Sequence, residues 1–356
     1  MIKMKNILFA FIAITTILLS TTNTSAQSKS AITNIADSGT ISLVTENIDV
    51  ATSFANTITQ DDLKTLVYKL ASDEFEGRRT GDNGQKIAAQ YLVDFYKNNG
   101  IIGAYKDSSY LQIIPQSYFR GRSKNNSENV VAFIEGSEKP DEYVVISAHY
   151  DHEGIKGKKI FNGADDDASG TSAVLEIAQA FKEAVNVGNG PKRSIIFLNV
   201  TGEEVGLFGS KFYTEFPIFP LKNTVANLNI DMIGRVDKKH MENDNYVYLI
   251  GADKISTELH ELSENVNKKY TNLTLDYTYN DENDPNRFYY RSDHYNFAKN
   301  GIPVIFYFNG VHKDYHKHTD TADKIRYDLL EKRTQLIFYT AWEIANREER
   351  LAIDKK

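Results

Sequence analysis

Short apolar runs alternate with segments of helical periodicity along most of the chain, and this alternation limits the fold more than any other feature. The runs predicted to be strands are 130–134, 143–147, 194–200, 224–230, 247–250 and 303–308. The segments predicted to be helices are 61–70, 84–98, 170–184, 256–269, 293–300 and 328–347. Strands that alternate with helices form a sheet that the helices cover. We therefore predict one α/β domain over residues 59–350, with a mostly parallel mixed central sheet and helices on both faces.

The start of the chain has the composition of a cleavable secretory signal. Two lysines precede an apolar stretch at residues 7–19, and small residues end at Ala26. The apolar stretch is shorter than the roughly 20 residues that a membrane-spanning helix needs. We expect a signal peptide over residues 1–26, export to the periplasm or the extracellular space, and no stable membrane association after cleavage. Residues 27–58 are rich in Ser, Thr, Asn and Ala and are predicted to be a flexible N-terminal segment.

The charge and the cysteine content narrow the possible partners. The formal net charge is −7, and it becomes −9 when Lys3 and Lys5 leave with the signal. Nucleic acids are bound by basic surfaces, so we expect no nucleic-acid partner. The chain contains no cysteine, which excludes disulfides, thiolate ligands and a lipid-anchored cysteine. Any metal would be bound by histidines and carboxylates.

Histidine and carboxylate residues follow the predicted strands. His149, Glu204 and Asp231 each come shortly after a predicted strand. Because the carboxyl ends of parallel strands meet at one edge of a sheet, these side chains are expected to lie close together. Asp165, in G-A-D-D-D-A-S-G, and His316, in D-Y-H-K-H-T-D-T, complete a set of two imidazoles and three carboxylates. Such a set suits two divalent cations when no thiolate is available.

Two more carboxylates have candidate roles beside these ligands. Glu203 is adjacent to Glu204 and is left over from the ligand set, which makes it a candidate general base for hydrolysis. Asp151 lies two residues after His149 and could accept the second N–H of that imidazole, which would select its tautomer.

The sequence also permits other interpretations of these motifs. The spacing of an EF-hand calcium loop occurs in Asp165, Asp167, Ser169, Gly170 and Glu176. No helix is predicted to enter that loop, so a carboxylate that bridges two metals is the favoured interpretation. Spacing alone does not choose between His316 and His318 as the last ligand. A serine hydrolase is disfavoured because the chain has no G-x-S-x-G motif.

Taken in order, the motifs resemble the secreted co-catalytic zinc aminopeptidase family, whose relatives include glutamate carboxypeptidase II and glutaminyl cyclase. The resemblance covers roughly residues 60–345. Its blocks are L-A-S-D-E-F-E-G-R-R-T-G, E-N-V-V-A-F-I-E-G, I-S-A-H-Y-D-H, G-A-D-D-D-A-S-G, T-G-E-E-V-G-L-F-G-S, N-I-D-M-I-G-R, R-S-D-H-Y-N-F-A-K-N-G-I-P and D-Y-H-K-H-T-D-T-A-D-K-I. Each block alone is weak, but their combination in this order is specific.

The resemblance implies a metal centre with two zinc ions per chain. Asp165 would bridge the two ions. His149 and Asp231 would complete the ligands of one ion, and Glu204 and His316 those of the other. The D-Y-H context favours His316 over His318, although the family usually has proline where His318 stands.

The resemblance also implies catalytic roles. Glu203 would act as general base and then as general acid, and Asp151 would orient His149. Tyr289 would support the tetrahedral intermediate.

The function implied is that of an aminopeptidase that hydrolyses the first peptide bond of peptides with a free N-terminus. A carboxypeptidase or dipeptidase stays open, because Arg287 and Arg291 could bind a substrate carboxylate. A glutaminyl cyclase would typically lack the D-D-D-A-S-G run. A non-catalytic metal-binding protein would have no use for Glu203.

Overall fold

The computed structural model describes residues 31–35, 41–45 and 49–355, so the predicted signal peptide lies outside the described residues. The first two of these ranges form strands β1 (Ala31–Ile35) and β2 (Ile41–Thr45), which pair antiparallel. Among the residues described, no helix combines the length and the apolar character that crossing a membrane requires.

The main compact unit begins at Val50, earlier than the predicted boundary at residue 59. Its first helix is α1 (Val50–Ala55), in which Phe54 and Ala55 are buried in the main core. The ring of Phe54 packs against Trp342, with a centroid distance of 5.7 Å. The segment is rich in polar residues and its apolar face is short, so the helix was not predicted from the sequence. The last part of the predicted flexible segment therefore belongs to the folded unit.

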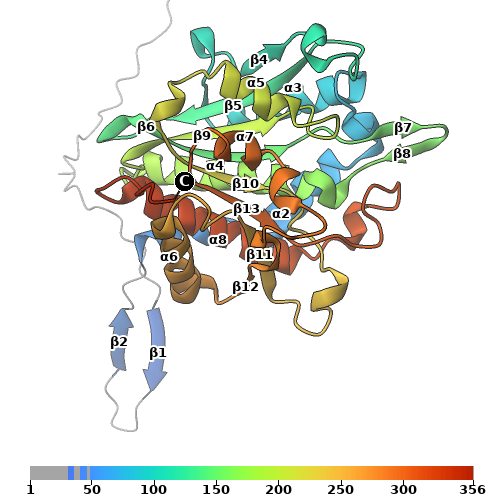
Figure 1. The fold of residues 1–356 in the computed structure, drawn as a ribbon. Helices are drawn as coiled ribbons and strands as arrows, with labels where there is room; N and C mark the ends of the chain where they lie inside the picture. Colours follow the sequence, from blue (N-terminus) through green and yellow to red (C-terminus); the bar gives the residue numbers. More distant parts are fainter. Residues whose placement is uncertain (1–30, 36–40, 46–48, 356) are drawn as a thin grey trace, which may run out of the picture. The chain divides into compact units, whose positions relative to one another are not determined.

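A mixed sheet forms the centre of the main unit (Figure 1). Its strands follow the spatial order β12 (Thr274–Asp276), β11 (Tyr246–Ile250), β13 (Val304–Phe308), β10 (Thr224–Ile230), β6 (Lys139–His149), β9 (Arg193–Val200), β5 (Ser127–Ile134) and β3 (Ile102–Gly103), with β4 (Leu111–Ile114) also paired to β5. The four central strands β13, β10, β6 and β9 are parallel. Antiparallel pairs join β5 to β9 and β11 to β13, so parallel pairing is confined to the centre and to the β11–β12 edge.

Helices cover both faces of this sheet, as predicted. The α-helices that follow α1 in the main unit are α2 (Gln60–Leu70), α3 (Asn83–Asn98), α4 (Gly170–Asn186), α5 (Phe208–Glu215), α6 (Thr257–Val266), α7 (His294–Ala298) and α8 (Tyr327–Asn346). Helices α4 and α8 contact β6 and β9 on one face. Helix α7 contacts β10 and β13, and its Phe297 belongs to the apolar cluster on the other face. The predicted α/β fold class is confirmed.

The central strands are buried on both faces, which explains their nearly continuous apolar runs. In β6, Val144 and Ile146 join the core beneath α4 and α8, whereas Val145 between them joins the cluster on the opposite face. Side chains alternate in this way because the period of a strand is two residues. A sheet of this kind leaves its strand ends, rather than its faces, available for chemistry.

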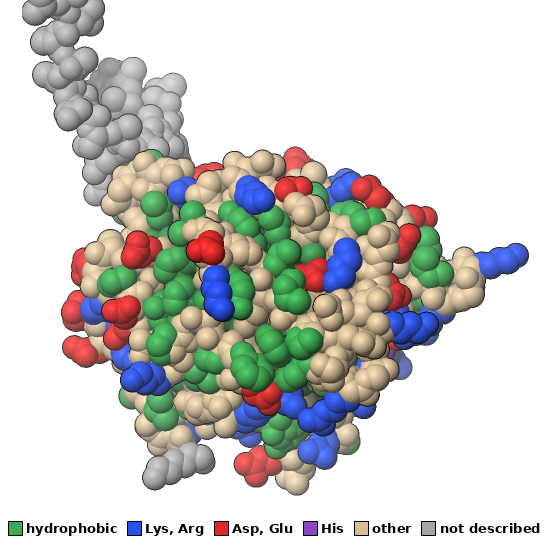
Figure 2. All heavy atoms as spheres, turned by 90° about the horizontal axis from the view of Figure 1, so that it is seen from above, with side chains coloured by type: hydrophobic (Ala, Val, Ile, Leu, Met, Phe, Trp, Pro, Cys, Tyr) green, Lys and Arg blue, Asp and Glu red, His purple; other side chains and the backbone are tan. Residues whose placement is uncertain are grey.

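One hairpin projects from the main unit beside those strand ends. Strands β7 (Gly154–Lys156) and β8 (Lys159–Phe161) pair antiparallel between β6 and α4. Lys156, Lys158 and Lys159 are exposed there. Figure 2 shows basic side chains at the end of the projection on the right, the side on which Figure 1 places this hairpin.

Candidate metal centre

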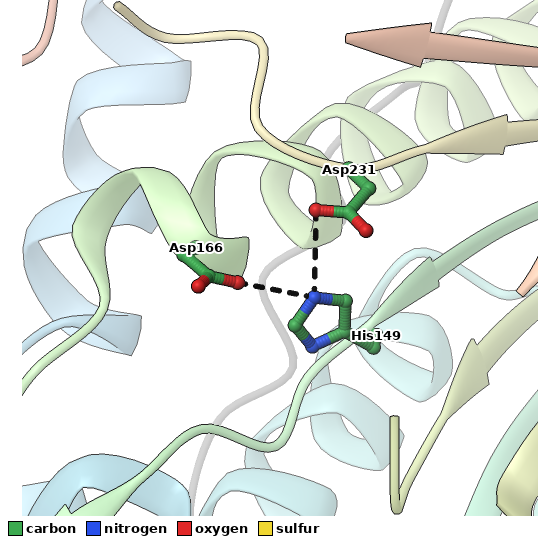
Figure 3. Close-up of side chains that lie close together, drawn as sticks. All are labelled: His149, Asp166 and Asp231. Atoms are coloured by element: carbon green, nitrogen blue, oxygen red, sulfur yellow. Dashed lines mark ion pairs between the residues drawn. The ribbon is translucent and has the colours of Figure 1, made fainter. Parts of the chain in front are cut away.

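The predicted ligands His149 and Asp231 meet at the carboxyl edge of the central strands. His149 is the last residue of β6, and Asp231 directly follows β10, the neighbouring parallel strand. His149 Nε2 lies 3.6 Å from Asp231 Oδ1 and 3.2 Å from Asp166 Oδ1. Figure 3 shows both carboxylates directed at this one nitrogen from different segments of the chain. These three residues form the first cluster.

The second cluster consists of Asp166, Glu204 and His316. His316 Nε2 lies 3.2 Å from Asp166 Oδ2 and 3.4 Å from Glu204 Oε2. His316 sits in a turn after β13 and adopts a φ of 54°, a left-handed conformation that histidine tolerates better than most residues. Asp166 therefore faces one histidine with each of its two carboxylate oxygens.

The position between the two histidines was predicted for Asp165, and this prediction is wrong by one residue. Asp165 Oδ1 accepts a hydrogen bond from the main-chain N–H of Gly234 at 2.7 Å, and Asp165 Oδ2 lies 3.1 Å from His312 Nε2. Asp167 Oδ1 accepts from the N–H of Met232 at 3.0 Å. The outer two carboxylates of the run thus hold the loop that follows β10. Only the middle one, that of Asp166, is directed at His149 and His316.

Local backbone geometry explains why Asp166 points this way. Gly163 begins the turn with a φ of +52°, and a Cβ there would lie 2.1 Å from the main-chain oxygen of Asp166 and 2.5 Å from the ring of His152. Only glycine permits so close an approach. The amides of Asp165 and Asp166 then donate to Asp320 Oδ2 at 2.9 and 3.2 Å.

The six atoms of the two clusters have the spacing of metal ligands. Nitrogen and oxygen ligands of a tetrahedral zinc, at about 2.0–2.1 Å from the ion, lie roughly 3.3 Å apart. The four histidine–carboxylate distances, 3.2 to 3.6 Å, agree with that value. His149 Nε2 and Asp166 Oδ2 are buried without a hydrogen-bond partner, which is costly unless a cation compensates. The residues present therefore fit a divalent metal in each cluster.

The EF-hand interpretation does not agree with the structure. Glu176, which would supply the last calcium ligand, is buried within helix α4. Burial, together with the charges of Asp62 and Glu183, raises the pKa of Glu176 to about 8. Asp165 and Asp167 hold main-chain amides of the loop after β10 instead.

Asp151 contacts His149 through its main chain, which differs from the prediction. His149 Nδ1 lies 3.0 Å from the Asp151 carbonyl oxygen and 3.8 Å from Asp151 Oδ1. The carboxylate accepts hydrogen bonds from Thr80 Oγ1 at 2.6 Å and from the Glu203 amide at 3.2 Å. Asp151 still selects the tautomer that leaves Nε2 of His149 for a metal, and its carboxylate also positions the segment that carries Glu203.

Glu203 borders a cavity that also exposes Asp166, Asp231 and His316. Its side chain is partly buried. Burial raises the pKa of the Glu203 carboxyl well above its usual range; the nearby carboxylates of Asp231 and Glu204 act in the same direction, and His149 acts against them. Glu203 is close to both clusters but belongs to neither, as expected of a proton carrier.

His152 lies beside the second cluster and was missed by the sequence reasoning. It is buried, and its Nδ1 lies 2.7 Å from Glu204 Oε1 and 3.8 Å from Asp166 Oδ2. Burial lowers the pKa of His152 to about 4, and neither His152 Nδ1 nor Glu204 Oε1 has a hydrogen-bond partner. The signal was available, because S-A-H-Y-D-H contains both histidines.

The cavity has aromatic walls, and Tyr289 is not among the residues that line it. The ring of Tyr289 packs against Tyr290 and His294 instead. Tyr315 lines the cavity, and its ring stacks on His316 with a centroid distance of 3.8 Å. The short helical turn at residues 288–290 directs consecutive side chains to different sides, so Phe288 lines the cavity and Tyr289 does not.

His318, the other candidate for the last ligand, lies away from both clusters. Its ring faces Phe161 of β8, with a centroid distance of 6.1 Å. His316 thus holds the position beside Asp166 and Glu204.

Comparisons with known proteins agree with this geometry. The sequence model of peptidase family M28 matches residues 129–341, more than half of the chain. The chain is 38% identical over 109 residues to the aminopeptidase NAALADL1 of Rattus norvegicus, which covers 30% of this chain and 14% of that protein. It is 25% identical over 261 residues to a probable zinc metalloprotease of Pyricularia oryzae, which covers 61% of this chain and 50% of that one.

The fold is also similar to that of solved structures. The LapA aminopeptidase of Legionella pneumophila superposes with a TM-score of 0.66 at 21% identity, covering 85% of this chain and 76% of that chain. The chain spans half or less of the length of the two relatives from Rattus norvegicus and Pyricularia oryzae.

Proposed function

Because the chain belongs to peptidase family M28, we propose that it is an aminopeptidase with two zinc ions, which removes the first residue of peptides that have a free N-terminus. The observation that carries the proposal is the Asp166 carboxylate, whose two oxygens face His149 Nε2 and His316 Nε2 separately at 3.2 Å. A carboxylate placed between two histidines in this way is suited to two cations.

His149, Asp166 and Asp231 would hold one ion, and His316, Asp166 and Glu204 the other. Zinc bound there would supply an activated water and polarise the scissile carbonyl. Glu203 borders the same cavity and is the group that would take a proton from the water and deliver it to the leaving amine. The main chain of Asp151 would hold His149 in the tautomer that presents Nε2.

The substrate's free amine has a physical reason to bind at this end of the cavity. Glu203 borders the cavity and is not assigned to either metal, so its carboxylate would attract a cationic amine. The cavity is lined on its other sides by apolar rings, so the first side chain of the substrate would enter between them.

An assay of the full-length protein on paired peptides tests the proposal. We expect cleavage of peptides with free N-termini, no cleavage of the same peptides after N-acetylation, and loss of activity in a chelator with recovery on adding zinc. Elemental analysis should find two zinc ions per chain. Equal cleavage of acetylated and free peptides would contradict the aminopeptidase assignment.

A further inference from the structure

Arg291 lines the cavity of the metal centre, and none of the ion pairs among the described residues involves it. Its guanidinium lies over the ring of Phe288, with Cζ 4.8 Å from the centroid. Its hydrogen bonds are long and go to neutral groups: Nη2 donates to the Tyr315 hydroxyl at 3.3 Å, and Nη1 donates to the Asn286 carbonyl at 3.5 Å. The aromatic contacts restrain the guanidinium while most of its N–H groups stay available.

Two other arginines of the molecule are paired with carboxylates. Arg235, close to the same centre, donates to Asp314 Oδ2 at 3.0 Å. Arg193 is buried and pairs with Glu142 Oε2 at 2.6 Å. An arginine that borders a cavity without a carboxylate partner is suited to receive one from a ligand, because its planar fork matches a carboxylate.

The walls between Arg291 and the metal centre are apolar. Phe288, Phe306, Phe308 and Met232 all line the cavity, and each is at most 6% exposed. A ligand that reaches from the metal centre to Arg291 therefore needs a short apolar stem with a polar end. An acidic amino-acid side chain has this form.

The charge balance of the centre gives Arg291 its influence. Asp166, Asp231, Glu203 and Glu204 would bring four negative charges, and the two divalent cations of the proposed function would offset them. Arg291 then contributes the remaining positive charge of the cavity. A negatively charged side chain would be favoured there over a positively charged one.

We propose that Arg291 is a specificity-determining residue that binds the carboxylate of the substrate's first side chain, so that the enzyme prefers peptides beginning with Glu or Asp. This inference rests on the proposed aminopeptidase function, and it adds the substrate class. Tyr315 and Phe288 both contact the guanidinium.

The ratio of kcat/KM for a glutamyl and a glutaminyl substrate isolates the charge, since the two side chains have the same shape. We expect the unaltered protein to cleave Glu-4-nitroanilide faster than Gln-4-nitroanilide. Arg291→Gln should lower this Glu/Gln ratio by about ten- to a hundredfold, the range of a charged hydrogen bond. Arg287→Gln is the matched control, because Arg287 lies in the same loop over the ring of Tyr290 and does not line the cavity. Its ratio should stay unchanged.

A charge reversal extends the test, and Arg291→Glu should make Lys-4-nitroanilide a better substrate than Glu-4-nitroanilide. A Glu/Gln ratio of one or less, unaffected by Arg291→Gln, overturns the inference while cleavage of Leu-4-nitroanilide keeps the aminopeptidase function. If Arg291→Gln loses activity selectively on free dipeptides while dipeptide amides are cleaved as before, the inference is also overturned. Arg291 would then bind the substrate's α-carboxylate. If no substrate with a free N-terminus is cleaved, the proposed function itself fails.

Discussion

The two clusters of the metal centre share Asp166 but differ in how the fold holds their histidines. His149 ends a central strand and its side chain is 1% exposed, whereas His316 lies in a surface turn and its side chain is 39% exposed. The imidazole of His149 is held by the Asp151 carbonyl, and that of His316 is held by stacking on Tyr315. The first cluster is built into the core, whereas the second is completed by a loop. The difference indicates that one half of the centre is preorganised by the sheet and that the other would depend more on the metal that it is proposed to bind.

Asp166→Asn should have the largest effect, because it removes the one residue common to both clusters. An amide offers a single oxygen and cannot serve two cations. We expect loss of most bound zinc and of essentially all activity, measured by elemental analysis and by peptide hydrolysis. Asp165→Asn is the matched control and should retain both metals, since its amide oxygen can still accept from Gly234. The reverse result, with metal lost only from the Asp165 variant, would restore the assignment made from the sequence.

Glu203→Gln should separate proton transfer from metal binding in both clusters. We expect kcat to fall by about 10²–10⁴, the usual contribution of a general acid–base group. Zinc content should stay the same, because Glu203 belongs to neither cluster. The measurement is kcat on a free peptide together with zinc per chain, and near-normal turnover would remove Glu203 from the mechanism.

His152→Phe should weaken the second cluster without touching the first. The variant removes the imidazole whose Nδ1 lies 2.7 Å from Glu204 Oε1. Loss of such a neighbour of a metal ligand typically lowers metal affinity about 10- to 100-fold. Competition with a chromophoric chelator should show one weakened site out of two. His318→Phe is the control, since His318 faces Phe161 outside both clusters, and equal weakening in the two variants would argue against a specific role for His152.

Chelation of the unaltered protein should show the smallest effect, a difference in rate between the two metals. The more exposed cluster of His316 should release its zinc several-fold faster than the cluster of His149. The chelator reaction would be quenched at intervals and the released zinc measured. We expect zinc release in two phases, and His316→Ala should abolish the faster one. Release in a single phase would mean that the two clusters act as one unit.

The strand-end residues were the part of the centre that could be predicted from the sequence. His149, Glu204 and Asp231 follow apolar runs that form neighbouring strands, and parallel strands bring such residues to one edge regardless of loop details. Helix α2 could also be predicted, because the signal at its start lies in the local sequence. The side chain of Thr59 caps it by accepting from the Asp62 amide at 3.2 Å.

The loop residues could not be assigned in the same way. The run of residues 165–167 offers three identical carboxylates, and the turn at Gly163 directs the middle one to the histidines. The buried helix α1 was missed because its apolar face is short and its neighbours are polar. Tyr289 and Tyr315 could be distinguished only after the chain had brought the 288–290 turn and the His316 loop together.

Periodicity and residue chemistry were thus enough to foresee an α/β sheet, its edge of polar strand ends and the kinds of group gathered there, because these depend on local backbone geometry and on pairing between neighbouring strands. Which oxygen faces which nitrogen, and which arginine borders the cavity, depends on turns whose direction is set by contacts between residues more than a hundred positions apart. Those contacts form only when the whole chain packs, so the final geometry of the centre is a property of the folded molecule.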